Sequence, residues 1–289
     1  YAMKSICVVC KKRRNKGLSM LRGKFDLVEV NKDIIKKKIK DKTKIKNIKY
    51  KNFDVGMGVF SSYTNLTRDT YLNGYLAKNS VDKLYSTSVT FYEFVKNFLV
   101  KNHFEKIITF NSRMSEKRAL LRAANFLNLK INNYEKLANE NFYNFEKYFS
   151  QDRFFLKKKI NKFLRKKKKI FLKENKFYKD KFNSVSDLIN EKIYTSRQKK
   201  NLLPTHYNPR SKNITFFTVS DDEHQSFGKE FNPPFLTNQK KIVEKICKMI
   251  EKKDDYYLWI RMHPRGSGVL WSESEFYHSL EKKYKNVSL

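Results

Sequence analysis

The sequence lacks any apolar run of the roughly 18 residues that a membrane-spanning helix needs. It begins at Tyr1, and no signal-like apolar stretch follows. These absences argue against an integral membrane protein. We therefore expect a cytoplasmic protein.

Cysteine is scarce. With 3 Cys in 289 residues, a disulfide framework is not predicted. Cys7 and Cys10 form a C-x-x-C pair, but no second pair follows, whereas a zinc site needs four ligands. We expect core packing in a strand from Ser5 to Val9 rather than metal or redox chemistry, and we expect no bound metal or cofactor.

Glycine is also scarce, with 8 residues, and this limits the possible ligand-binding loops. Gly56 and Gly58 do not match G-x-G-x-x-G, so no dinucleotide-binding fingerprint is present. The sequence has no G-x-S-x-G nucleophile elbow either. We interpret Asp54 to Ser62 as a strand that runs into a loop of small residues.

Acidic residues are few: 29 Asp and Glu stand against 63 Lys and Arg, for a net charge of +34. Hydrophobic residues make up 40% of the chain, which is typical of a globular protein and not of a disordered basic tail. The same Lys-rich, Asn-rich bias also arises in AT-rich genomes. No RNA-binding, zinc-finger or helix-turn-helix pattern accompanies the charge, so we expect no specific nucleic acid partner.

Alternation of short apolar strands with amphipathic helices predicts an α/β fold. In the first half, Lys106 to Phe110 is a strand, Ser115 to Leu127 a helix and Leu129 to Glu135 a second strand, an order that indicates a parallel sheet. A second unit of the same plan follows Pro209. Further expected elements are strands at 25–30, 214–219, 256–262 and 286–289, and helices at 33–46, 89–100, 238–250 and 274–284.

The two units predict two Rossmann-like domains, at residues 1–150 and 213–289, with a segment at 151–212 between them. Because the chain starts without Met and stops inside a strand, we expect a fragment whose second domain is truncated. The connecting segment is rich in Lys and apolar residues between Phe154 and Phe182. It is either a solvated interdomain helix or a docking surface for anionic lipid or single-stranded nucleic acid.

The segment from Tyr256 to Met262 reads as a buried strand that must stop before Pro264. Arg261 and His263 are two residues apart, so on a strand they share a face. Together with Arg265 they would form an anion site beyond the strand's carboxyl end, where α/β sheets bind ligands. In the alternative reading, Arg261 pairs with a core acid and His263 caps the turn.

The turns after Phe110 and Val219 would border the same cleft between the two domains. They contribute cationic and polar groups suited to a diphosphate, and three side chains could act as acid or base. The polar candidates are Asn111, Arg113 and Ser220, and the acid–base candidates are Glu135, Glu223 and His263.

Several short runs follow one another in a recognisable order: Phe110-Asn111-Ser112-Arg113 with Arg118, Arg122 and Tyr134-Glu135, then Phe216 to Glu223, then Gln239 opening a helix, and Ile260 to Pro264. In this order they resemble the GT-B type glycosyltransferases of capsule and surface-polysaccharide assembly. The Arg-x-His-Pro ending is also similar to one in the CDP-glycerol polymerases of teichoic-acid synthesis. The chain has Ser112 where the family's F-N-G-R pattern has glycine.

The resemblance implies a glycosyltransferase that moves a sugar from a nucleotide-activated donor to a surface or capsular glycan, free or lipid-linked. Arg261, His263, Arg265 and Ser220 would then hold the donor phosphates, and Asn111 and Arg113 would lie on the acceptor side. A basic segment at 154–182 would place the protein at the inner face of the cell membrane. The alternative is a non-catalytic basic protein that binds nucleic acid or another polyanionic surface.

Overall fold

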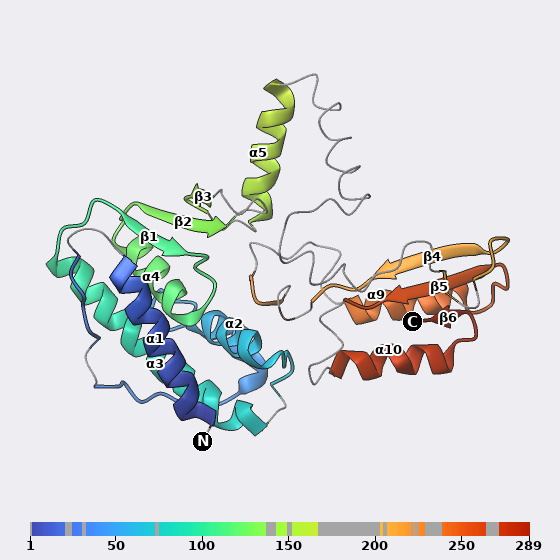
Figure 1. The fold of residues 1–289 in the computed structure, drawn as a ribbon, viewed down its shortest axis with the longest axis horizontal. Coiled ribbons are helices and arrows are strands. Elements are labelled where there is room, and N and C mark those ends of the chain that lie inside the picture. The colour runs from blue at the N-terminus through green and yellow to red at the C-terminus, as the bar shows by residue number, and fades with distance from the viewer. Residues whose placement is uncertain are drawn as a thin grey trace. The chain divides into compact units, whose positions relative to one another are not determined.

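The computed structural model describes residues 2–20, 25–30, 33–72, 75–136, 143–148, 152–166, 203–204, 207–220, 222, 225–228, 239–263 and 272–289. The chain divides into two compact units, residues 1–32 and residues 33–289. The helices and strands are labelled in Figure 1.

The first unit contains one helix, α1 (Ala2–Met20), where the sequence predicted a strand from Ser5 to Val9. Val8 and Cys10 are exposed instead of buried in a core. The prediction was wrong because a four-residue apolar run fits a helix as well as a strand, and the Lys-rich residues around it are good helix formers. Residues 25–30 are not a strand either, since they pair with none of the strands in the described part of the chain.

An extended segment at residues 33–40 opens the second unit, in place of the expected surface helix. It lies along α3 (Tyr75–Lys101) and is followed by the short 3-10 helix η1 (Lys42–Asn47). The amides of Ile35, Lys37 and Ile39 donate to side chains of α3, at N···O distances of 2.9, 3.0 and 2.9 Å. These bonds replace the intrahelical bonds that a helix would have made.

The region read as a strand and loop from Asp54 to Ser62 is helix α2 (Val55–Thr67). Gly56 has a packing role there, because a Cβ at this position would lie 1.8 Å from the Ile45 carbonyl oxygen of η1. The sequence reading took the two glycines as loop residues, whereas Gly56 permits the close approach of a neighbouring turn.

The predicted βαβ unit of the first half is confirmed. β1 (Ile107–Phe110) pairs in parallel with β2 (Ile131–Lys136), and α4 (Ser115–Phe126) connects them. An added strand, β3 (Tyr143–Glu146), pairs antiparallel with β2, which gives the sheet order β1-β2-β3. Helices α2, α3 and α4 pack on one another and bury the first apolar core, which includes Phe53, Val59, Phe60, Tyr63, Val81, Tyr92 and Ala123.

A second sheet is formed near the end of the chain and is parallel throughout. Its order is β4-β5-β6, as drawn at the right of Figure 1. A separate core, with Val243, Cys247, Leu258, Tyr277 and Val287, lies between this sheet and its helices. The elements are β4 (Lys212–Phe217), α9 (Gln239–Ile250), β5 (Tyr256–Arg261), α10 (Ser272–Lys283) and β6 (Val287–Ser288).

The predicted α/β class is therefore confirmed. The basic segment is helical over α5 (Arg153–Lys166), and residues 167–182 lie outside the described part of the chain. Among the described helices, none combines the length and the apolar character needed to cross a bilayer.

Candidate functional site

The turn between β1 and α4 has an unusual backbone at the position where the resembling family has glycine. Asn111 and Ser112 have φ values of 58° and 45°, in the left-handed region that favours glycine. Ser112 is fully buried, and its Oγ donates a hydrogen bond to Oδ1 of Asn133 on β2. Ser112 thus adopts the left-handed backbone conformation that usually requires glycine, and its side chain is held by Asn133 of the neighbouring strand.

Arg113 connects this turn to two other parts of the fold. Its Nη1 donates to Ser226 Oγ at 3.1 Å, and its Nη2 donates to Asn65 Oδ1 of α2 at 3.4 Å. The guanidinium also lies over the Phe227 ring, 4.9 Å from the centroid. The loop after β4 therefore contacts the turn after β1.

A second polar contact joins the same loop to the end of α2. Arg68, which ends α2 in a left-handed conformation, forms an ion pair with the buried carboxylate of Asp222. The hydroxyl of Ser220 donates to the other oxygen of Asp222 at 2.7 Å. Ser220, predicted to bind donor phosphate, is buried and orients this carboxylate.

The ends of β4 and β5 are held together around Thr218. Its amide donates to the Arg261 carbonyl at 3.0 Å, and its Oγ1 accepts from the His263 amide at 2.9 Å. The buried Gln239 side chain accepts from the Val219 amide at 3.1 Å and donates to the Val219 carbonyl at 3.0 Å. Gln239 is also the first residue of α9, which confirms the predicted helix start.

A basic pocket of about 890 Å³ lies at the start of α2, between this helix and α4. Asp54 at its wall accepts two hydrogen bonds from Arg122, at 2.7 and 2.9 Å, and one from Arg118 at 3.0 Å. Burial alone would raise the pKa of Asp54, but the Arg122 hydrogen bond and the Arg118 charge outweigh it and hold the pKa below its usual value. The pocket is lined by Lys46, Asn47, Lys49, Lys51, Asn52, Asp54, Met57, Arg118, Arg122, Asn125, Phe126 and Gly228.

This lining carries several cations and one carboxylate, which suits a small anion. Lys46 and Lys51 have polar partners at the rim: Lys46 donates to Gln225 at 2.7 Å, and Lys51 pairs with Glu93 at 2.6 Å. Phosphate or carboxylate groups would bind such a pocket through charge-assisted hydrogen bonds.

The structure brings some of the predicted residues together. Asn111 and Glu135 lie at adjacent strand ends, since the Asn111 amide donates to the Tyr134 carbonyl at 3.3 Å. Arg261 is exposed at the last position of β5, and His263 is half-buried. Glu223 and Arg265 lie outside the described residues.

Among the described residues, Arg261 forms no ion pair with a core acid. The alternative in which Arg261 pairs with such an acid is therefore not supported by this part of the chain. The backbone bond of His263 to Thr218 fits the alternative role of closing the turn. Whether both side chains face an interdomain cleft stays a prediction.

Sequence reasoning missed Asp54, Arg68 and Asp222. The four-residue spacing of Arg118 and Arg122 was a usable signal, because it places both on one helix face. Their carboxylate partner could not be found while residues 54–62 were read as a strand. Asp222 stands in a run of acids, and periodicity does not reveal which of them is buried.

Within the described ranges, no cluster of three or more His, Cys, Asp and Glu side chains has a metal-binding arrangement. Comparisons with protein-family profiles, with curated proteins and with solved structures find no match to this chain.

Proposed function

We propose that the protein is a glycosyltransferase of the GT-B type, in which two Rossmann-like domains at 1–150 and 213–289 face each other. It transfers a sugar from a nucleotide-activated donor to a surface or capsular glycan. The proposal rests on the sequence motifs described above and on the contact between the loops at the strand ends.

The observation that carries the proposal is the Arg113–Ser226 hydrogen bond of 3.1 Å. It joins the turn after β1 of one parallel βαβ unit to the loop after β4 of the other. Ligands of open α/β sheets bind beyond the carboxyl ends of the strands. Two such ends in contact would give one site with a donor side and an acceptor side.

The chemistry assigns a role to each side of this site. A general base, Glu135, Glu223 or His263, takes the proton of the acceptor hydroxyl as its oxygen forms a bond to the anomeric carbon. The bond from that carbon to the donor diphosphate breaks, and the diphosphate leaves with the electron pair. Cationic side chains stabilise the departing charge, which is the task of Arg261 and Arg265.

Nucleotide-sugar binding tests the proposal through Arg261. Calorimetry with a panel of uridine, cytidine, guanosine and adenosine diphosphate sugars should show binding to at least one of them. Arg261→Gln should raise its Kd about tenfold to a hundredfold, because a charge-assisted hydrogen bond contributes about 1.5–3 kcal/mol.

Arg210→Gln is the matched control, since Arg210 is equally an exposed arginine but precedes β4 instead of following β5. It should leave the Kd unchanged. Equal weakening by both substitutions, or strong salt-dependent binding to any polyanion without nucleotide-sugar binding, would contradict the proposal and favour the non-catalytic alternative.

A further inference from the structure

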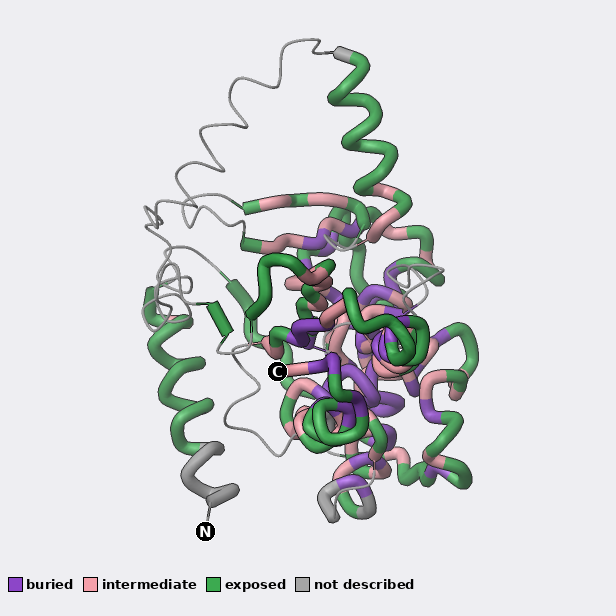
Figure 2. The backbone as a smooth tube through the Cα atoms, turned by 90° about the vertical axis from the view of Figure 1, so that its right-hand side faces the viewer, coloured by how far each residue is buried: buried purple, intermediate pink, exposed green. Residues whose placement is uncertain are grey.

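Helix α5 carries large apolar side chains on an exposed surface. Figure 2 shows it as the exposed helix at the top of the view. Leu156, Ile160 and Leu164 are 37%, 54% and 53% exposed, and Phe163 is also exposed. Every charged residue of the helix is Lys or Arg, and Asp and Glu are absent from Arg153–Lys166. Exposed aliphatic side chains gathered on one helix mark an interaction surface.

Four of the apolar residues form one stripe, and Phe154 lies exposed on another side of the helix. Leu156, Ile160, Phe163 and Leu164 have the spacing i, i+4, i+7 and i+8, which places them along one side of the helix. This spacing distinguishes α5 from a helix whose apolar residues are scattered singly over its surface.

The contacts of α5 with β3 leave that stripe exposed. Asp152 Oδ1 accepts from the Phe155 amide at 2.9 Å and caps the helix. The Phe155 ring packs on Tyr148, with centroids 4.8 Å apart, and Lys159 pairs with Glu146 of β3. Phe155 and Lys159 are four residues apart and share one side of the helix with Phe163, whereas Ile160 and Leu164 lie farther round the helix.

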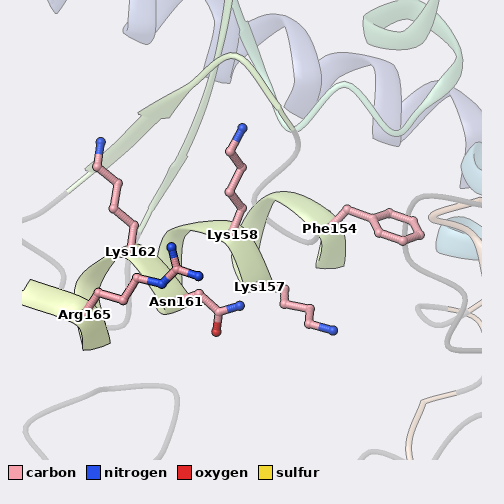
Figure 3. Close-up of a pocket in the computed structure, with 6 residues that line it drawn as sticks. All are labelled: Phe154, Lys157, Lys158, Asn161, Lys162 and Arg165. Atoms are coloured by element: carbon pink, nitrogen blue, oxygen red, sulfur yellow. The ribbon is translucent and has the colours of Figure 1, made fainter.

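The remaining surface is basic. Figure 3 shows the side chains of Lys158 and Lys162 extending from successive turns toward the same side. Phe154, Lys157, Asn161 and Arg165 complete the lining of a shallow hollow on the helix. Around its circumference, α5 thus has a side that contacts Tyr148 and Glu146, an aliphatic stripe and a cationic side.

We propose that α5 docks the protein on an anionic lipid bilayer. Leu156, Ile160 and Leu164 enter the boundary between headgroups and acyl chains, while the surrounding Lys and Arg side chains lie near lipid phosphates. A basic polar face opposite an apolar stripe is the composition of helices that lie in the membrane interface. The proposal is independent of the proposed sugar transfer.

The side chains favour lipid over single-stranded nucleic acid. Base stacking requires aromatic side chains, whereas the stripe is mostly Leu and Ile, which suit acyl chains. Charge complementarity selects an anionic bilayer over a neutral one. Each Lys near such a surface strengthens binding by about 1 kcal/mol, or about fivefold.

Vesicle sedimentation of the full chain tests the proposal with three variants. Vesicles of phosphatidylcholine alone are compared with equimolar phosphatidylcholine and phosphatidylglycerol. The charge variant is Lys157→Gln, Lys158→Gln and Lys162→Gln. The stripe variant is Ile160→Ser and Leu164→Ser. The matched control carries Lys245→Gln, Lys252→Gln and Lys282→Gln, at exposed positions on α9, in the turn after it and on α10.

The unmodified chain should bind only the anionic vesicles. The charge variant should weaken binding on the order of a hundredfold, from about fivefold for each Lys. The stripe variant should weaken it at least tenfold at unchanged charge, and the control should match the unmodified chain.

Three outcomes would overturn the proposal. The first is equal binding to neutral vesicles. The second is an equal loss in the control, which would trace binding to the overall charge of the chain. The third is a stripe variant that binds the anionic vesicles as tightly as the unmodified chain.

Discussion

At the scale of single residues, Asp54 is a carboxylate that pairs with two arginines. It neutralises Arg118, whose side chain is 1% exposed, and it bonds Arg122 through both carboxylate oxygens. The arginines belong to α4, and Asp54 precedes α2, so the cluster fixes one helix against the other. Losing one partner leaves a buried charge without compensation, which is costly.

Asp54→Asn should lower the free energy of unfolding by about 3 kcal/mol at neutral pH. Because the folded pKa of Asp54 lies below its unfolded value, its contribution is complete above about pH 4 and is lost as the pH falls through the folded pKa. Urea unfolding at a series of pH values should therefore show the two proteins converging in acid.

Asp254→Asn provides the control, since Asp254 pairs with Lys285 on the surface with both side chains largely exposed. It should leave stability unchanged at every pH. A difference between Asp54→Asn and the unmodified chain that persists undiminished at the acid end would show that ionisation of Asp54 is not the cause.

At the scale of elements, the extended segment at 33–40 depends on a match between its own rise per residue and the rise per residue of helix α3. Two residues of extended chain advance about 6.6 Å, and four residues of helix advance about 6.0 Å. The amides of Ile35, Lys37 and Ile39 accordingly meet Thr90, Ser86 and Asp82, which are spaced by four along α3. Side chains of α3 thus accept the hydrogen bonds that a neighbouring strand would accept in a sheet.

Ser86→Ala should release the middle of this segment. Ser86 Oγ accepts from the Lys37 amide at 3.0 Å and donates to the Lys37 carbonyl at 2.8 Å. Both backbone groups would lose their partner, at a cost of about 1–2 kcal/mol. Hydrogen exchange read by mass spectrometry should be about tenfold faster over residues 35–39.

Thr87→Ala is the matched substitution one residue along, on the exposed side of α3, where the hydroxyl bonds only the Lys83 carbonyl of its own helix. Exchange over residues 35–39 should not change. If Thr87→Ala accelerates exchange as much as Ser86→Ala, helix propensity and not the bridging hydroxyl holds the segment.

At the scale of the whole molecule, the described apolar residues form two separate cores, one under each sheet. The loop after β4 makes polar contacts with the first sheet's part of the fold, through Arg113 with Ser226 and through Arg68, at the end of α2, with Asp222. Apolar burial provides most of folding stability, whereas single polar contacts add little. We therefore expect the two cores to open independently.

Cys247 reports on the second core, because burial raises the pKa of its thiol to about 11 and it is fully buried in α9. Alkylation requires the thiolate, so iodoacetamide should label Cys247 only when this core opens. Val243→Ala, in the same core, should accelerate labelling about thirtyfold, as expected for a loss of about 2 kcal/mol.

Val59→Ala makes the same truncation at an equally buried valine of the first core. It should leave the labelling rate of Cys247 unchanged. Acceleration by both substitutions would mean that the two cores unfold as one cooperative unit. Cys10, exposed on α1, should react at once in every variant.

The sequence predicted much of the α/β framework. β1, α4 and β2, and later β4, α9, β5 and α10, lie where apolar periodicity indicated. These elements are amphipathic or wholly buried, so the pattern of apolar residues is imposed by the core they face. Three segments read as strands near the start of the chain failed. Residues 5–9 and 54–62 are helical, because a short apolar run does not distinguish a strand from a helix, and residues 25–30 form no strand.

The candidate site was only partly predictable for a different reason. Strand ends collect polar residues, which identified Asn111, Arg113 and Ser220 from the sequence. Which of these residues meet depends on contacts far apart in the chain, such as Arg113 with Ser226 and Arg68 with Asp222. No local pattern encodes a partner more than a hundred residues away.

The sequence alone thus determined the α/β class, the parallel βαβ order and the basic, apolar composition of α5, because local periodicity and charge govern them. Only the tertiary structure decided that Ser112 takes a glycine-like conformation, that Asp54 joins Arg118 and Arg122, and that residues 33–40 stay extended along α3. In each of these cases, contacts with distant residues outweigh the local preference of the chain.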